Sequence, residues 1–269
     1  MIPVAGFARL NGITFIGPKH QVTTTTKNGV ITIKHRKTPR IFSNSGWWTS
    51  VPLLRGAWMI VAMLGSMVIN SGWLAKTLMG FWLMLNLSFI FWPNAETVPR
   101  TPPPPPDTLV ISINPFDVLF FFMVIAMSFA LKGLWQYHAA EHMSINTHEA
   151  GKSLDVKNIQ QSSQISPRCG SNIVVIIFLV QILLFRVLDM KVIPFLDIAI
   201  MFAISYEIHR WQFKPFLWLG YLVQKYLVTR KPNEYHLVVG SIGLESLISL
   251  EETGQLPKHY AAMPNTSSK

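Results

Sequence analysis

The sequence predicts an all-α integral membrane protein with about four transmembrane helices, further interfacial helices and a small β-rich N-terminal extramembrane segment. Three observations support this fold class. Half of the 269 residues are hydrophobic and 13% are charged, which is about half the charged fraction of a typical soluble domain. Several apolar runs approach the length of roughly 20 residues that crosses a bilayer. The run at 73–92 also begins and ends with tryptophan, as the interfacial anchors of a membrane span do.

The first 50 residues are expected to form the β-rich segment. Residues 22–34 are rich in threonine, valine and isoleucine, and these residue types favour strands. Asn28-Gly29, in the middle of this stretch, is a strong signal for a two-residue hairpin turn. Lysines and arginines surround the turn, so the positive-inside rule places the segment in the cytoplasm.

The rest of the chain alternates between apolar and polar stretches. In chain order, the expected segments are the β-rich segment at 1–50, an interfacial or re-entrant helix and the first span at 51–92, a proline-rich linker at 93–114, a span at 115–134, a loop with the candidate metal site at 135–171, two spans at 172–208, and an interfacial helix with a polar tail at 209–269. The stretch at 51–92 contains two apolar runs, at 51–70 and 73–92. If the N-terminus is cytoplasmic and both runs crossed the membrane, the basic C-terminus would lie outside. We therefore expect a multi-pass cell-membrane protein in which only the run at 73–92 of these two crosses and both termini are cytoplasmic.

The distribution of charge narrows the set of expected partners. The net charge is +10, but the basic residues flank the apolar runs and no nucleic-acid fold signature is present. We expect the lipid bilayer and a membrane protein as partners, and no nucleic acid.

The single cysteine, Cys169, excludes an intramolecular disulfide and fits a reducing compartment or a thiol with a role of its own.

A candidate catalytic motif follows the apolar run that ends near Leu134. His138 and His142 stand four residues apart with Glu141 beside them, so in a helix both imidazoles project from one face. H-x-x-E-H is the inverted zincin pattern, in which two histidines bind Zn²⁺ and the glutamate is the general base for a water. The alternative is a set of polar side chains that reach water near a membrane interface.

A catalytic zinc site usually has three protein ligands, so a third must come from elsewhere in the chain. In descending order of preference, the candidates are Glu149, Cys169, Glu207 and His148. The Cys169 thiol follows the cationic Arg168 and would suit a soft metal, although a small buried cysteine explains it equally well. Glu207, at the end of a span, is expected to be functional or paired with Arg210 or Arg55.

Two residues are assigned catalytic roles. Glu141 is expected to be the general base, with orientation of an imidazole as its alternative role. Arg168 is expected to stabilise an oxyanion or to bind a phosphate, with plain interfacial charge as the alternative. No serine lies in a G-x-S-x-G elbow and no glycine-rich nucleotide loop is present, which argues against a serine hydrolase and against a kinase or ATPase.

Further short motifs occur in a fixed order along the chain. They are Pro52 with Leu54-Arg55-Gly56, Tyr137-His138-Ala139-Ala140-Glu141-His142, Pro167-Arg168-Cys169-Gly170-Ser171, Ser205-Tyr206-Glu207, and Gln224 with Thr229-Arg230 and Pro232. Each is weak alone, but together and in this order they resemble the YqhQ-like family. The resemblance covers most of the chain and implies a bacterial membrane protein with a metal-dependent activity.

The chain departs from the family pattern at a few positions. Ser166 stands where the family has histidine, Ala139 replaces a glycine, and Asn11 and Lys231 replace acidic residues, which indicates a divergent member. The intact H-x-x-E-H motif favours a metal-dependent membrane enzyme, most simply a hydrolase at the cytoplasmic face that uses a divalent ion such as Zn²⁺. Ser166 favours the alternative, a non-catalytic membrane protein that binds or regulates a partner complex.

Overall fold

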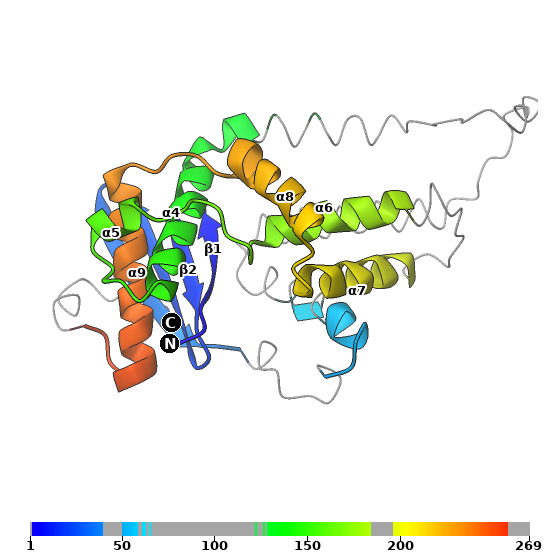
Figure 1. The fold of residues 1–269 in the computed structure, drawn as a ribbon. Coiled ribbons are helices and arrows are strands. Elements are labelled where there is room, and N and C mark those ends of the chain that lie inside the picture. Colours follow the sequence, from blue (N-terminus) through cyan, green and yellow to red (C-terminus); the bar gives the residue numbers. More distant parts are fainter. Residues whose placement is uncertain are drawn as a thin grey trace, which may run out of the picture.

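The computed structural model describes residues 2–39, 50–58, 128–183 and 196–257, with single residues at 61, 62, 65, 122 and 126. Its main elements are β1 (Ala5–Arg9), β2 (Gly12–Ile16), β3 (His20–Lys27), β4 (Val30–Lys37), α4 (Lys132–Glu149), α5 (Val156–Gln160), α6 (Gly170–Gln181), α7 (Leu196–Arg210), α8 (Lys214–Val223), the π-helical turn η4 (Gln224–Val228) and α9 (Glu234–Thr253). The sheet with α4, α5 and α9 forms one group, and α6, α7 and α8 form a second (Figure 1).

The four strands form an antiparallel sheet in chain order, β1-β2-β3-β4. Asn28 and Gly29 connect β3 to β4 with φ of 51° and 80°, and Lys27 pairs with Val30 across the turn. Positive φ at both central residues is typical of the type I′ turn, which matches the twist of a hairpin and favours Asn-Gly. The hairpin predicted at this position is confirmed.

The apolar core lies between the sheet and the helices α4 and α9 (Figure 1). Ile13, Phe15 and Val22 of the sheet are fully buried, and so are Leu244 and Leu247 of α9. Helix α4 packs on β1, β2 and α9, while α5 contacts both α4 and α9. Burial of a large apolar side chain contributes about 1.5–3 kcal/mol, so this core holds α4 in a fixed position.

The predicted fold class is wrong. A four-stranded antiparallel sheet packed with helices replaces the all-α membrane architecture. Within the ranges given above, no helix has both the length and the apolar character needed to cross a bilayer. This finding also contradicts the predicted transmembrane helices and the multi-pass cell-membrane location with cytoplasmic termini. The first expected span, at 73–92, and the proline-rich linker lie outside the described residues.

Packing between helices explains part of the misleading hydropathy. Helix α6 overlaps the segment at 172–208, in which two spans were expected. Its Ile176 and Val180 are buried, and the helix packs on both α7 and α8. Apolar side chains that serve contacts between neighbouring helices raise the hydropathy of a segment as a membrane span would. The segment 135–171, expected to be a loop, contains most of α4 and all of α5.

Candidate metal centre

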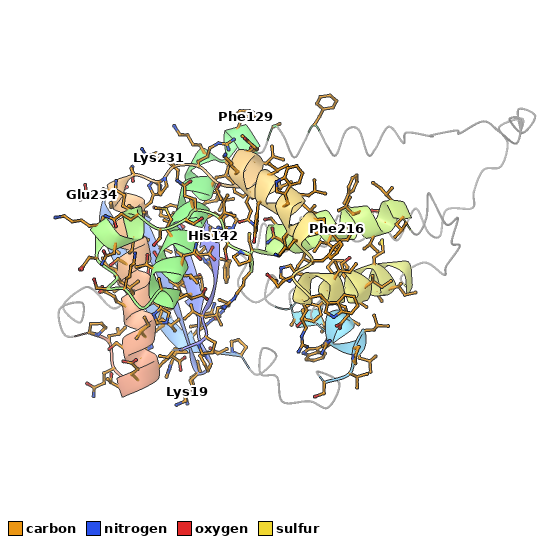
Figure 2. All side chains as sticks on the ribbon, in the orientation of Figure 1. Lys19, Phe129, His142, Phe216, Lys231 and Glu234 are labelled. Atoms are coloured by element: carbon orange, nitrogen blue, oxygen red, sulfur yellow. The ribbon has the colours of Figure 1, made fainter. Side chains whose placement is uncertain are left out.

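The H-x-x-E-H motif is helical and lies in the middle of α4. His138 and His142 project from the same side, and their ring centroids are 4.3 Å apart. His142 is buried, at 3% exposure, and lies between the sheet group and the α6–α8 group (Figure 2). The helical spacing predicted for the two imidazoles is therefore confirmed, because one turn of helix brings residues i and i+4 together.

Cys169 joins the two histidines from the start of α6. It is the N-cap of that helix, and its Sγ lies 3.4 Å from His138 Nε2. One ligand atom from each of His138, His142 and Cys169 lies within 4.8 Å of the others. Two nitrogens and a sulfur at this separation are a donor set that suits Zn²⁺.

The second ring nitrogen of each histidine is held by a backbone carbonyl. His138 Nδ1 donates to Val228 O over 2.7 Å, and His142 Nδ1 donates to Gln164 O over 2.7 Å. Because a carbonyl only accepts, each Nδ1 carries a proton, and in the neutral form of each ring Nε2 then has the lone pair that a metal needs. Metal-binding histidines in proteins almost always have such a partner for the other ring nitrogen.

Glu141 is a buried carboxyl group next to the histidine pair. It is 4% exposed, and burial raises its pKa to about 7, against the smaller opposing effect of nearby His138. Its Oε2 has no hydrogen-bond partner among the described residues. The carboxyl group packs against β1 at Gly6, where a Cβ atom would lie 2.8 Å from Glu141 Oε1. A glycine at this position therefore makes the room that the carboxyl group occupies.

The other predicted site residues have different partners. Glu149 Oε1 accepts from Arg168 Nη1 over 2.5 Å, and this ion pair borders a hollow of about 410 Å³ with Ile2 and Pro3. Neither side chain belongs to the group of three possible ligands. The structure thus brings Arg168 to Glu149, the first-choice third ligand, and brings Cys169 to the histidines.

Glu207 and His148 also lie apart from the histidine pair. Glu207 accepts from Arg55 Nε over 2.7 Å and from the Leu53 backbone N–H over 3.2 Å. The Arg55 guanidinium lowers the pKa of this carboxyl. Of the two partners expected from the sequence, Arg210 and Arg55, the structure pairs Glu207 with Arg55. His148 Nε2 lies 3.3 Å from Ile2 O, at the end of α4 rather than in a loop.

The sequence motifs include Gln224, but nothing in them indicates that Gln224 and Asn146 hold the loop around the site. Asn146, one turn beyond His142, donates to Ser163 O over 2.8 Å and to Ile165 O over 3.1 Å. Gln224 binds the backbone of Ser166 from a distance of 58 residues along the chain. A pair so far apart leaves no periodic or spacing signal in one sequence.

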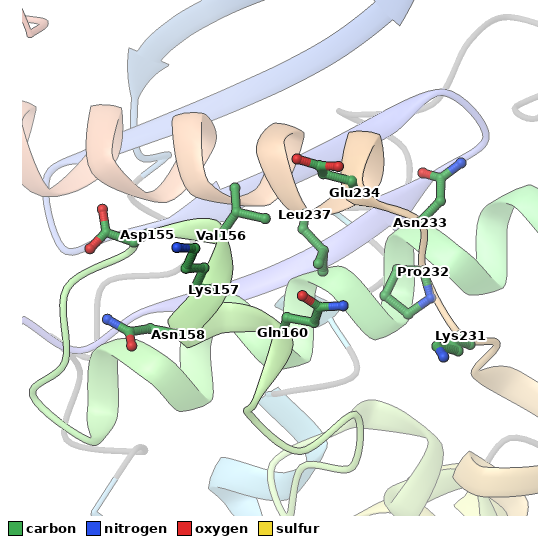
Figure 3. A pocket seen from close by; sticks show the side chains of 10 residues that line it. All are labelled: Asp155, Val156, Lys157, Asn158, Gln160, Lys231, Pro232, Asn233, Glu234 and Leu237. Atoms are coloured by element: carbon green, nitrogen blue, oxygen red, sulfur yellow. The ribbon is translucent and has the colours of Figure 1, made fainter.

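A cavity of about 1020 Å³ lies away from the histidines, between α5 and the start of α9 (Figure 3). Its lining residues are Asp155, Val156, Lys157, Asn158, Gln160, Lys231, Pro232, Asn233, Glu234 and Leu237. None of the three possible metal ligands or Glu141 borders it. The size of this cavity therefore adds nothing to the argument for a metal centre.

Comparison with known proteins yields a family without an assigned activity. Residues 108–250 match the family described as "Protein of unknown function (DUF1385)", and this range includes all three possible ligands. The chain is 26% identical over 167 residues to the Uncharacterized protein YqhQ of Bacillus subtilis (strain 168), over 53% of this chain and 50% of that protein. It thus spans about half the length of this relative. No solved structure matches the chain.

Proposed function

The chain belongs to the DUF1385 family of proteins of unknown function, and we propose that it is a Zn²⁺-dependent hydrolase whose metal is held by His138, His142 and Cys169. One observation carries the proposal: ligand atoms from these three residues lie within 4.8 Å of one another. The carbonyls that hold both Nδ1 atoms support it, because they leave both Nε2 atoms available for coordination.

Three possible ligands come together among the described residues, and this number favours a catalytic role. Structural zinc sites are usually closed by four protein ligands, whereas catalytic sites use three and keep one position open. A zinc ion in such a site acts as a Lewis acid and activates water near neutral pH.

Glu141 is the group that we assign to proton transfer. In the metal-free protein the pKa of this buried carboxyl is about 7, and a carboxyl with such a pKa is able both to accept and to release a proton near neutral pH. The unpartnered Oε2 leaves one oxygen available for a water or a substrate group. Arg168 is engaged by Glu149, so the anion-binding role assigned to it requires this ion pair to open.

A second candidate function is favoured by the burial of the site. His142 and Cys169 are 3% and 6% exposed, as expected for a metal that only holds the structure together. In that case the chain is a non-catalytic protein that binds or regulates a partner, with α4 and the segment at 161–169 tied together by the metal.

Metal analysis of the purified full chain tests the site. We expect about one zinc per wild-type chain and little in His142→Ala or Cys169→Ser, because each removes one of three ligands. Glu149→Gln is the matched control: it lies on the same helix, outside the donor set, and is expected to keep its zinc. Zinc-free wild type after reconstitution, or zinc lost from Glu149→Gln alone, would contradict the assignment.

Substitution of zinc by Co²⁺ separates the two candidate functions. If one coordination position is open, a small chelating ligand such as acetohydroxamate should bind the cobalt and change its visible absorption spectrum. A closed structural site should give the same spectrum with and without this ligand. Glu141→Gln is expected to keep the metal in both cases, since Glu141 is not one of the ligands.

A further inference from the structure

We propose that Gln224 is the positioning residue of the candidate metal centre, and that it holds both Cys169 and His138 in place. The inference rests on the metal site proposed above and adds a residue that does not touch the metal. Gln224 is 0% exposed and stands where α8 passes into η4. Its side chain reaches the segment that carries Cys169, and its backbone begins the turn that ends beside His138.

The side-chain amide of Gln224 holds the backbone of Ser166 on two sides. The Ser166 N–H donates to Gln224 Oε1 over 2.9 Å, and Gln224 Nε2 donates to Ser166 O over 3.0 Å. Nε2 also donates to Asn172 Oδ1 over 2.6 Å, while Asn172 Nδ2 donates to Pro167 O over 2.9 Å. Ser166 and Asn172 stand three residues before and after Cys169, so the amide fixes this segment at both ends.

The backbone of Gln224 acts on the first histidine. Gln224 is the first residue of η4, and Val228 is the last. Thr229 Oγ1 donates to Gln224 O over 2.7 Å, which ties the two ends of the turn together. Val228 O is the acceptor for His138 Nδ1. Single π-helical turns are rare and frequently lie at functional sites; this one carries the carbonyl that orients an imidazole.

The hydrogen bonds explain why an amide is required at this position. The contacts with Ser166 and Asn172 need one acceptor and one donor group at the same side-chain end, which glutamine supplies and glutamate or methionine does not. Ser166, Asn172 and Gln224 are all buried. Water therefore cannot replace the missing partner at low cost if the amide is removed.

A Co²⁺ titration of the full chain tests the inference, because a cobalt-bound thiolate is visible as sulfur-to-metal charge-transfer absorption. Gln224→Met is expected to weaken Co²⁺ binding about 10- to 100-fold, as loss of a group that orients metal ligands typically does. It should also reduce the charge-transfer absorption per bound ion, because Cys169 is no longer held beside the histidines. This spectral change reports ligand placement, which general loss of stability would not alter.

Gln21→Met is the matched control. Gln21 is also buried, at 1% exposure, and it accepts from Arg36 Nε over 3.0 Å in the sheet. Its replacement should lower stability and leave both the Co²⁺ affinity and the spectrum at wild-type values. Wild-type affinity and spectrum in folded Gln224→Met would overturn the positioning role.

A milder variant keeps the test decisive if Gln224→Met does not fold. Thr229→Val loses only the hydroxyl that donates to Gln224 O. Weaker Co²⁺ binding with the charge-transfer absorption per bound ion retained supports the inference, because this change loosens the His138 side alone. Wild-type affinity overturns the claim that Gln224 holds both ligands. If the wild-type chain binds no Co²⁺, the proposed metal centre itself is wrong and the role of Gln224 falls with it.

Discussion

The two sides of α4 are held by different kinds of interaction. Toward the sheet and α9, Tyr137, Ala140 and Met143 are part of one continuous apolar core. Away from the sheet, His138, His142 and Asn146 follow one another at intervals of one turn, and each bonds to a backbone carbonyl outside the helix. Apolar contacts are non-directional and contribute mainly stability. The hydrogen bonds are directional, so they set the orientation of the rings.

Adjacent residues on the two sides provide the strongest test of this difference. Met143→Ala, on the apolar side, is expected to lower the free energy of unfolding by about 2–5 kcal/mol, as removal of a large buried side chain does. Its metal content per folded chain should stay at the wild-type value. Chemical denaturation and metal analysis of Met143→Ala and His142→Ala would show the contrast. Loss of metal from folded Met143→Ala would contradict the separation of the two sides.

The pH dependence of stability tests the burial of Glu141. Its pKa of about 7 exceeds the ordinary value near 4.5, so the folded protein binds the proton more tightly than the unfolded chain. The resulting stability is fully present below about pH 4.5 and is lost as pH rises through 7, amounting to at most about 3 kcal/mol. Glu141→Gln in the metal-free protein should remove this dependence. Denaturation at pH 5 and pH 8 measures it, and parallel curves for both proteins would contradict the prediction.

Gly6 provides a test of the packing around Glu141 from the side of the sheet. A methyl group at Gly6 would lie within 3.0 Å of three atoms of the Glu141 side chain, so Gly6→Ala is expected to cost about 1–3 kcal/mol through overpacking. In a Glu141→Ala background the same change should cost much less, since the carboxyl group is gone. A double-mutant cycle measures this coupling. Equal costs in both backgrounds would mean that Gly6 serves another purpose.

The Arg168–Glu149 ion pair is expected to have the smallest effect. The Arg168 side chain is 65% exposed and that of Glu149 31%, and surface ion pairs contribute about 0–1 kcal/mol. Glu149→Gln should therefore change stability by less than about 1 kcal/mol, with the difference shrinking at high salt. Denaturation at low and high ionic strength checks this. A larger, salt-independent loss would point to a buried role for Glu149.

The correct predictions rest on short stretches of sequence. The type I′ turn depends on Asn28 and Gly29 alone, because both residues tolerate positive φ. Placement of His138 and His142 on one face depends on helical spacing alone.

The membrane prediction failed because hydropathy does not tell what covers an apolar side chain. Ile176 and Val180 are buried within the protein, in a helix that packs on α7 and α8. A lipid tail and a neighbouring helix are equally apolar surroundings. Sequence composition therefore left the choice open, and only the arrangement of the helices shows which residues contact one another.

The sequence by itself determined the local features: the hairpin turn and a pair of histidines one turn apart with a glutamate beside them. The tertiary structure decided which residue joins that pair. It brought Cys169, 31 residues from His138, to within 3.4 Å of the imidazole and paired the nearer Glu149 with Arg168. The reason is physical: spacing along one helix is set by backbone geometry, whereas contacts between distant segments depend on packing and on hydrogen bonds such as those of Gln224.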